Sequence, residues 1–273
     1  MTNGVERNVR ETSFEVWLQD VENSWKNPPE FKIDTKKLVH LAIICDGNRR
    51  GARARGLPDY LGHRVGIETI KGIARASRDW GLKTLTFWVW STENWQRDKE
   101  QVEFVMYLAQ SFLSDKELVD ELVGKQVRFR HLGRKDRIPK GVKDAIDELE
   151  EKTAQFGKYT LNLALDYGGI DEIARAWGKM HELAVIDPTF FKKVIEDPKI
   201  IYNFLDTAGQ EPPDMIIRTG MEKGEVLRTS GFMPLQTAYS GFFPVEEYFP
   251  DVKPMQLIEK IQRFQEYEMR LGR

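Results

Sequence analysis

Apolar residues follow two different spacings along this chain, and the two spacings alternate. Short, nearly continuous apolar runs predict buried strands at residues 41–45, 84–90, 126–132, 159–165, 215–218 and 237–243. Between them, apolar residues recur three and four positions apart, which predicts helices at residues 62–80, 99–122, 139–153, 170–183 and 254–271. Strands that alternate with helices are typical of βαβ units. The pattern therefore predicts an α/β fold, a single domain with a central, mostly parallel β-sheet flanked by helices.

Residues 1–38 precede this alternation and form an N-terminal extension to the domain at 39–273. The extension contains a short amphipathic helix that ends before the proline pair at 28–29. Its apolar face consists of Phe14, Trp17, Leu18, Val21 and Trp25. We expect this face to pack on the domain. A peripheral membrane contact is the alternative, which the mixture of acids and bases on the polar face disfavours.

Composition narrows the class of protein. Hydrophobic residues make up 41% and charged residues 31% of 273 positions, as in globular proteins. The 41 basic and 43 acidic residues give a net charge of −2, so the overall charge does not favour nucleic-acid binding. The single cysteine, Cys45, excludes an internal disulfide framework. No apolar run approaches the roughly 20 residues that span a bilayer, and no signal peptide is evident, so we expect a cytoplasmic protein.

Ligands of parallel sheets bind beside the loops that follow the strands, here the loops after residues 45, 90, 165 and 218. The first loop carries the sequence DGNRR at 46–50. Gly47 lets backbone amides approach an anion, and Arg50 offers a forked donor to phosphate. Asp46 would repel a diphosphate unless Mg²⁺ lay between them. A simple turn followed by a basic surface is the alternative for this loop taken alone.

The second loop carries the sequence STENWQR at residues 91–97. Ser91 can hydrogen-bond a phosphate, Arg97 can pair with it, and Trp95 can pack against an apolar chain. A Ser-Thr helix cap is the alternative, and it accounts for Ser91 or Thr92 but not for the whole string. Likewise, His63 could donate to a phosphate near a helix start, or it could be purely structural.

These blocks, read together, resemble the cis-prenyltransferase family, which includes undecaprenyl diphosphate synthase. The resemblance rests on HLAIICDGNRRGARARGLPDYLGHRVG from residue 40, LTFWVWSTENWQR from residue 85 and DMIIRTG from residue 214. Their order and spacing agree with the family from His40 to the C-terminus. The DGNRR form resembles archaeal and eukaryotic members.

The resemblance implies a (Z)-polyprenyl diphosphate synthase that condenses isopentenyl diphosphate with an allylic diphosphate and releases diphosphate. It implies Mg²⁺ at Asp46 and a role in proton loss for Asn94, which we interpret as positioning because an amide is a weak base. It also implies a homodimer, with Arg270 reaching into the partner's site. The implied substrate-binding residues are Gly47, Asn48, Arg49, Arg50, His63, Ser91, Thr92, Glu93, Trp95, Arg97, Arg218, Arg228, Thr229, Ser230 and Arg270.

A growing prenyl chain needs an apolar tunnel, and we expect residues 87–90 and the helix at 99–122 to line it. A plain core is the alternative interpretation of these apolar residues. The aspartate-rich DDxxD motifs of trans-type prenyl synthases do not occur in the sequence, which agrees with the cis family.

The chain departs from the family pattern at three positions. Gly51 stands where the family has an aromatic, Asp59 where bacterial members often have arginine, and Gly241 where bacterial members have a metal-binding glutamate. Loss of the aromatic could widen the allylic pocket. Two alternatives therefore stay open, an enzyme that joins C5 units in an irregular or branched way, and a non-catalytic partner subunit that binds isoprenoid.

Overall fold

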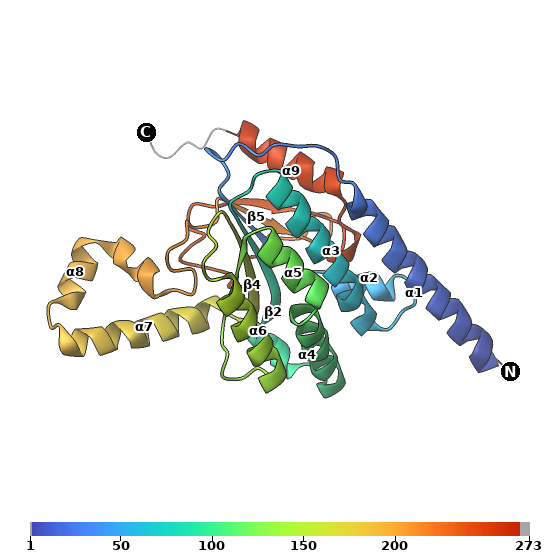
Figure 1. Ribbon diagram of the computed structural model, residues 1–273, viewed down its shortest axis with the longest axis horizontal. Coiled ribbons are helices and arrows are strands. Elements are labelled where there is room, and N and C mark those ends of the chain that lie inside the picture. The colour runs from blue at the N-terminus through green and yellow to red at the C-terminus, as the bar shows by residue number, and fades with distance from the viewer. Residues whose placement is uncertain (1, 268–273) are drawn as a thin grey trace.

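The computed structural model describes residues 2–267 and is built on one six-stranded sheet in the order β3-β4-β2-β1-β5-β6 (Figure 1). Every neighbouring pair of strands is parallel, which confirms the predicted α/β class. The strands are β1 (His40–Ile44), β2 (Thr84–Ser91), β3 (Val127–Leu132), β4 (Tyr159–Tyr167), β5 (Met215–Arg218) and β6 (Gly241–Pro244).

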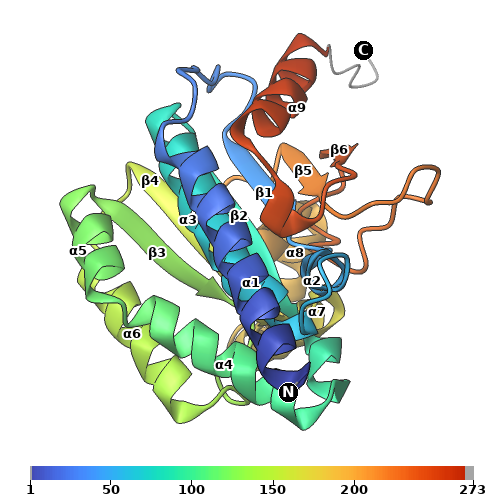
Figure 2. The same cartoon turned by 90° about the vertical axis from the view of Figure 1, so that its right-hand side faces the viewer.

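Helices cover both faces of the sheet, and Figure 2 shows α1, α3 and α4 in front of it with α7 and α8 behind. The α-helices are α1 (Thr2–Lys26), α2 (Asn48–Arg53), α3 (Asp59–Asp79), α4 (Lys99–Leu113), α5 (Lys116–Gly124), α6 (Lys140–Thr153), α7 (Gly169–Ile186), α8 (Phe190–Glu196) and α9 (Pro254–Glu266). The 3₁₀ turns are η1 (Thr92–Gln96), η2 (Pro198–Phe204) and η3 (Phe249–Asp251).

Several predicted boundaries were wrong. The single helix predicted at 99–122 is two helices, because the Asp115 carboxylate accepts a hydrogen bond from the Glu117 amide at 3.1 Å and starts α5 there. The strand predicted at 237–243 is confined to β6. The short helices α2 and α8 were not predicted. The last helix was predicted to reach residue 271, but α9 ends at Glu266, and residues 268–273 lie outside the described part of the chain.

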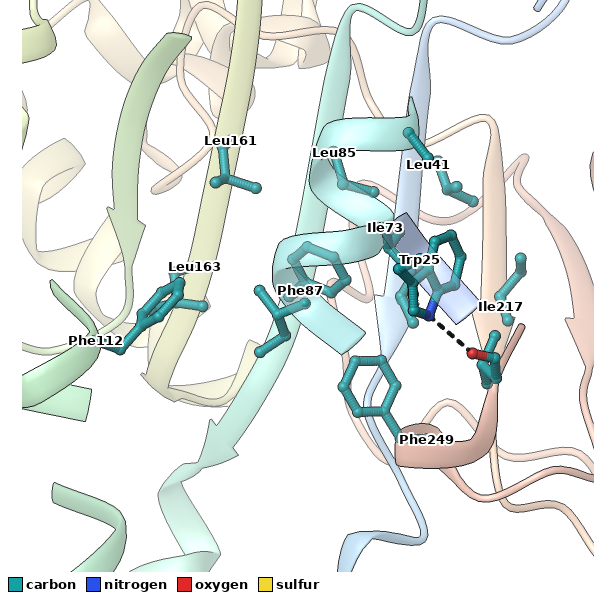
Figure 3. Close-up of a cluster of buried hydrophobic side chains, with 14 of the residues drawn as sticks. Trp25, Leu41, Ile73, Leu85, Phe87, Phe112, Leu161, Leu163, Ile217 and Phe249 are labelled. Atoms are coloured by element: carbon teal, nitrogen blue, oxygen red, sulfur yellow. Dashed lines mark hydrogen bonds between the residues drawn. The ribbon is translucent and has the colours of Figure 1, made fainter. Parts of the chain in front are cut away.

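Side chains alternate across the sheet and form two unequal cores. Leu41, Leu85 and Phe87 point into the larger core, which α3, α4, α6 and α9 cover (Figure 3). Ala42 and Trp88 point to the opposite face, where a smaller cluster forms. Because successive residues of a strand point to opposite faces, strands buried on both faces read as continuous apolar runs.

The N-terminal helix packs its apolar face on α3, as its periodicity predicts. Trp17, Val21 and Trp25 are buried in the main core. The Trp25 indole also donates to the Val252 carbonyl at 3.1 Å, a bond drawn in Figure 3. The helix has 25 residues and so is longer than predicted. Among the described residues, no helix combines the length and apolar character needed to cross a membrane.

A buried histidine, His40, lies at the smaller face of the sheet with both ring nitrogens in hydrogen bonds. His40 is fully buried, with ring nitrogens 2.7 Å from the Glu211 carbonyl and 2.7 Å from the Thr86 hydroxyl. Burial lowers the pKa of His40 to about 4, and the bond to Glu211 opposes this only partly. The folded state therefore binds fewer protons than the unfolded state between the folded pKa and the ordinary histidine pKa of about 6.5.

We expect the free energy of unfolding to fall as the pH drops through that window, with His40 contributing about 2 kcal/mol between pH 7 and pH 5. Urea unfolding at the two pH values measures this. The His40→Gln variant should lose that part of the pH dependence. An equal pH dependence in the variant would contradict the assignment to His40.

Candidate active site

The carboxyl ends of β1, β2 and β5 meet at a cleft of about 670 Å³. Most of the predicted site residues line it: Asp46, Gly47, Asn48, Arg49, Arg50, His63, Ser91, Glu93, Asn94, Arg97, Arg218 and Ser230. Other predicted residues do not line the cleft: Thr92, Trp95, Arg228 and Thr229. Arg270 lies outside the described residues.

Asp46 lines the cleft and lies two residues after the end of β1 at Ile44. Its Oδ2 accepts from Nη2 of Arg218 at 2.9 Å, and its Oδ1 lies 3.2 Å from Nη2 of Arg50. The carboxylate is about one-third exposed, at 36%. Arg218 comes from the end of β5 and also donates to the Arg228 carbonyl at 2.6 Å and the Ser230 hydroxyl at 3.0 Å. The carboxylate therefore faces solvent between two guanidinium groups, one from α2 and one from the end of β5.

The backbone turn after Asp46 requires glycine at position 47. Gly47 adopts φ of 98°, and a Cβ there would lie 2.8 Å from a ring carbon of Tyr248. Its amide donates to Oδ1 of Asp46 at 2.6 Å. The chain then enters α2, which carries Asn48, Arg49 and Arg50, so these residues stand on a short helix and not in the open loop that the sequence predicts.

The cleft concentrates positive charge in a chain that is slightly acidic overall. Arg49 and Arg53 are both held by Asp59 at the start of α3, with distances of 2.8 Å and 2.5 Å, and these partners hold the pKa of Asp59 below its usual range despite its partial burial. The guanidinium of Arg97 lies over the Trp90 ring, 5.1 Å from its centroid. Among the side chains that the structure describes, those of residues 13–267, no carboxylate lies within ion-pair distance of Arg97. Such a cleft attracts multiply charged anions.

The β2 side of the cleft is fixed by a 3₁₀ turn. In η1, the Asn94 amide oxygen accepts from the Ser91 amide at 3.2 Å, which completes a capping box. The Trp95 indole points away from the cleft and donates to the Asp166 carboxylate at 2.7 Å. Its ring packs edge-on against Trp90, at 5.8 Å between centroids. Trp95 thus supports the wall of the cleft from behind.

His63 lies at the floor of the cleft, where α3 passes under α2. Burial is the largest cause that lowers the pKa of His63 to about 4, and the nearby cations Arg97 and Arg49 lower it further. The imidazole is therefore neutral at pH 7 and can donate one hydrogen bond without adding charge.

Sequence reasoning missed several residues that line the cleft. Arg53 was not predicted because it lies outside the DGNRR motif. The signal for it is its spacing of four positions from Arg49, which places both arginines on one face of a helix. Cys45 was assigned only to the buried strand, although it also lines the cleft. Trp88 and Trp90 fall within residues 87–90, which were expected to line a tunnel, but they line the cleft itself.

An apolar cavity of about 70 Å³ continues below the cleft. It shares His63 and Val89 with the cleft and is walled by apolar residues of α3 and α4. Ile70 and Phe112 also line a second cavity of about 20 Å³, whose lining includes the charged residues Lys71, Arg75 and Glu121. Part of the helix expected to line a tunnel does face the apolar cavity, through Val105, Leu108 and Phe112.

The structure places the two departures at positions 51 and 241 in different parts of the fold. Gly51 is buried in α2, does not line the cleft, and faces Trp17 and Tyr248. The loss of the aromatic therefore does not widen the cleft. Gly241 starts β6 opposite Met215, at the end of β5 that lies away from Arg218.

A comparison of the whole chain with known protein families identifies the family to which it belongs. Residues 44–272 match the family model described as "Putative undecaprenyl diphosphate synthase". The chain belongs to this family. As a member of the undecaprenyl diphosphate synthase family, it is a prenyltransferase.

Curated relatives carry synthase and transferase names. The chain is 40% identical over 238 residues to the tritrans,polycis-undecaprenyl-diphosphate synthase (geranylgeranyl-diphosphate specific) of Thermococcus kodakarensis, with 86% of each chain covered. It is 34% identical over 263 residues to the isoprenyl transferase of Bacillus cereus, covering 96% of this chain and 95% of the relative.

Solved structures of the family share the fold. The chain is similar to lavandulyl diphosphate synthase from Lavandula x intermedia, crystallised with dimethylallyl diphosphate, with a TM-score of 0.78 and 28% identity. The match covers 88% of this chain and all of that one, at 100%. Together these relatives support the main interpretation from the sequence and neither of its alternatives.

Proposed function

We propose that this prenyltransferase condenses isopentenyl diphosphate with an allylic diphosphate, with Mg²⁺ required and diphosphate released. The observation that carries the proposal is the placement of Asp46 between Arg50 and Arg218 at the mouth of an apolar cavity. Two diphosphates and one apolar chain need such a combination, with separate cationic groups around one carboxylate and an apolar space beneath them.

We assign the allylic diphosphate to the side of the cleft formed by Arg50, His63, Ser91 and Arg97. Donors fixed in these places would stabilise the charge that develops on the leaving diphosphate. The diphosphate of isopentenyl diphosphate is assigned to Arg218 and Ser230. Holding both substrates in this way converts the condensation into a reaction between oriented groups.

The residues of the cleft fit a magnesium ion that arrives with its substrate. Among the described side chains, which are those of residues 13–267, no group of three or more metal-binding side chains occurs. Magnesium, however, is commonly held by one or two carboxylates, phosphate oxygens and water. Asp46 would supply the carboxylate, and the diphosphate would supply further oxygens. The ion would add positive charge beside the leaving group.

Proton loss from isopentenyl diphosphate completes the reaction. Asn94 lines the cleft, but its amide oxygen is engaged by the Ser91 backbone. We therefore assign Asn94 to orienting the substrate or a water molecule through its remaining amide hydrogens. The apolar cavity between α3 and α4 would take the allylic chain.

The partition between the apolar cavity and the second cavity is expected to limit product length. Replacing Phe112 by alanine removes the ring shared by both cavity linings and should join them. We expect Phe112→Ala to shift products toward longer chains, at a stability cost of about 3–5 kcal/mol. Thin-layer or mass analysis of dephosphorylated products measures the shift.

Leu122→Ala is the matched control for this prediction. Leu122 lines only the second cavity, so its truncation enlarges that cavity and leaves the partition in place. Its products should keep the wild-type length. Longer products from Leu122→Ala, or unchanged products from Phe112→Ala, would show that the partition does not set the length.

We further propose a homodimer that uses the arm formed by α7 and α8. This arm projects from the sheet (Figure 1) and carries exposed apolar side chains, including Ile186 at 80% and Ile195 at 79% exposure. Apolar patches of this kind are typical of interaction surfaces. Arg270, near the C-terminus, would then serve the partner's site.

We expect the double variant Ile186→Glu/Ile195→Glu to be monomeric at micromolar concentration in sedimentation velocity experiments. Charges buried against a second copy would lack partners and oppose association. Val16→Glu is the control, because Val16 is also exposed but lies on α1. A double variant that sediments like the wild type would place the interface elsewhere.

The deciding experiment is a radiolabelled isopentenyl diphosphate assay on the purified chain. Dimethylallyl, farnesyl and geranylgeranyl diphosphates would be offered, each with and without Mg²⁺, and the products sized. Metal-dependent elongation is the expected result. A folded chain that yields no product with any primer would refute independent synthase activity. A cytoplasmic location and a membrane contact remain predictions from the sequence.

A further inference from the structure

The N-terminal helix supplies a ring to the helix that carries the phosphate-binding residues. Gly51 lies in α2, and a Cβ there would be 3.5 Å from ring carbons of Trp17 and 3.4 Å from Cβ of Tyr248. Trp17 comes from α1 and is only 4% exposed. The space beside position 51 is therefore filled by a ring from α1, where the family resemblance implies an aromatic at position 51 itself.

Polar contacts tie this ring to its surroundings. The Trp17 indole donates to Oδ1 of Asp251 at 2.8 Å. Arg55, just after α2, donates to the same carboxylate at 2.8 Å and to the Gly51 carbonyl at 3.0 Å. Its guanidinium also lies 4.2 Å from the centroid of the Trp17 ring. Trp17, Gly51, Arg55 and Asp251 thus form a closed set of contacts, which we call the Trp17 brace.

The brace continues to the cleft through residues 248–251. The Phe249 amide donates to the Asp46 carbonyl at 3.0 Å. The Tyr248 ring faces the guanidinium of Arg50 at 5.7 Å, and Tyr248 also contacts Gly47 closely. One layer of residues therefore separates Trp17 from the groups that we assign to Mg²⁺ and the allylic diphosphate.

A helix as short as α2 needs such support. It comprises Asn48–Arg53, and its N-cap residue Gly47 provides no side-chain cap. An isolated helix of this length is not stable in water, so packing must hold it. Trp17 packs on one side of α2, while α3 packs on another.

We propose that Trp17 is a positioning residue for the allylic diphosphate site, through which α1 holds α2 and residues 248–251 in place. This inference rests on the proposed function of the cleft. It predicts that loss of the Trp17 ring weakens binding of diphosphate with Mg²⁺ without removing any group that touches the ligand.

Trp25 offers a matched control on the same helix. It is also buried, and its indole also donates to the segment after η3, at the Val252 carbonyl. Its ring, however, lies against Gly72 of α3 and not against α2. Trp17→Ala and Trp25→Ala both loosen α1, but only the first removes the brace.

The experiment measures binding of inorganic diphosphate with Mg²⁺ by calorimetry, together with KM for the allylic substrate and the unfolding midpoint. We expect Trp17→Ala to weaken diphosphate binding and raise this KM about tenfold, as for the loss of roughly 1.4 kcal/mol. Trp25→Ala should lower the unfolding midpoint, but the affinity for diphosphate and the KM for the allylic substrate should stay within twofold of the wild type. Trp17→Phe, which keeps a ring but loses the bond to Asp251, should fall between the wild type and Trp17→Ala.

A second pair of variants tests whether the Trp17 ring occupies the space beside position 51. Gly51→Phe should disrupt α2 while Trp17 is present, because both rings cannot occupy one space. Gly51→Phe combined with Trp17→Ala should recover binding relative to either single variant. Equal effects of Trp17→Ala and Trp25→Ala on diphosphate binding, or no recovery in the combined variant, would overturn the proposal. Absence of prenyl transfer by the wild type would refute the proposed function instead, and the binding data would still decide this inference.

Discussion

Asp46→Asn is expected to lower kcat about 100- to 1,000-fold, the loss typical of removing one electrostatic contributor from an active site. Asparagine keeps the size of the side chain but not its charge. Arg50 and Arg218 would then face each other's positive charge without the carboxylate that now lies between them. Any Mg²⁺ that accompanied the substrate would lose its carboxylate ligand, so the Mg²⁺ concentration needed for half-maximal rate should also rise.

Steady-state assays across a magnesium titration check this result. Glu222→Gln is the matched control, because Glu222 also pairs with Arg50, at 3.8 Å, but is 80% exposed and lies on a surface loop. Its activity should remain near the wild-type value. If Asp46→Asn kept more than about a tenth of the wild-type kcat, the central role of this carboxylate would be wrong.

Arg218→Lys is expected to raise KM for isopentenyl diphosphate about 10- to 100-fold, since a hydrogen bond to a charged group contributes roughly 1.5–3 kcal/mol. The Arg218 fork bridges Asp46, the Arg228 carbonyl and Ser230, and a lysine cannot hold these three partners at once. The KM for the allylic substrate should change little.

Arg97→Lys is the reciprocal variant. Arg97 belongs to the loop after β2 and lies on the Trp90 ring, on the side assigned to the allylic diphosphate. Its replacement should raise the allylic KM and spare that of isopentenyl diphosphate. Initial-rate measurements with each substrate varied in turn separate the two effects. A shift of the same KM in both variants would contradict the assignment of one diphosphate to each side.

The sequence predicted the order of strands and helices well because β1, β2, β4 and β5 are buried along most of their length, on both faces of the sheet. Continuous apolar runs such as 41–45 and 84–90 are typical of buried strands. Helix boundaries that depend on one local hydrogen bond were not predicted. At Asp115, for example, the side chain caps α5 and so divides the helix predicted at 99–122. The last strand was misplaced because β6 has only four residues, of which none is fully buried.

Within the site, residues next to strand ends were placed correctly because parallel strands bring their carboxyl ends together. Asp46 and Arg218 meet for this reason. The sequence could not reveal which side of a loop residue faces the cleft, so Trp95 was assigned to substrate although its indole bonds Asp166. Nor could it reveal that Trp17 fills the space beside Gly51, since that contact depends on where α1 docks.

The pairing of β1 with β5 determines when the active site forms during folding. Asp46 and Arg218 are 172 positions apart in the chain, and they meet only when β5 joins β1. Contacts between such distant segments form late, because closing a long loop costs conformational entropy before these contacts can stabilise the chain. During refolding from urea, helical signal should therefore return before enzymatic activity. On the ribosome, the amino-terminal two-thirds of the chain would emerge with an incomplete site and depend on later synthesis to finish it.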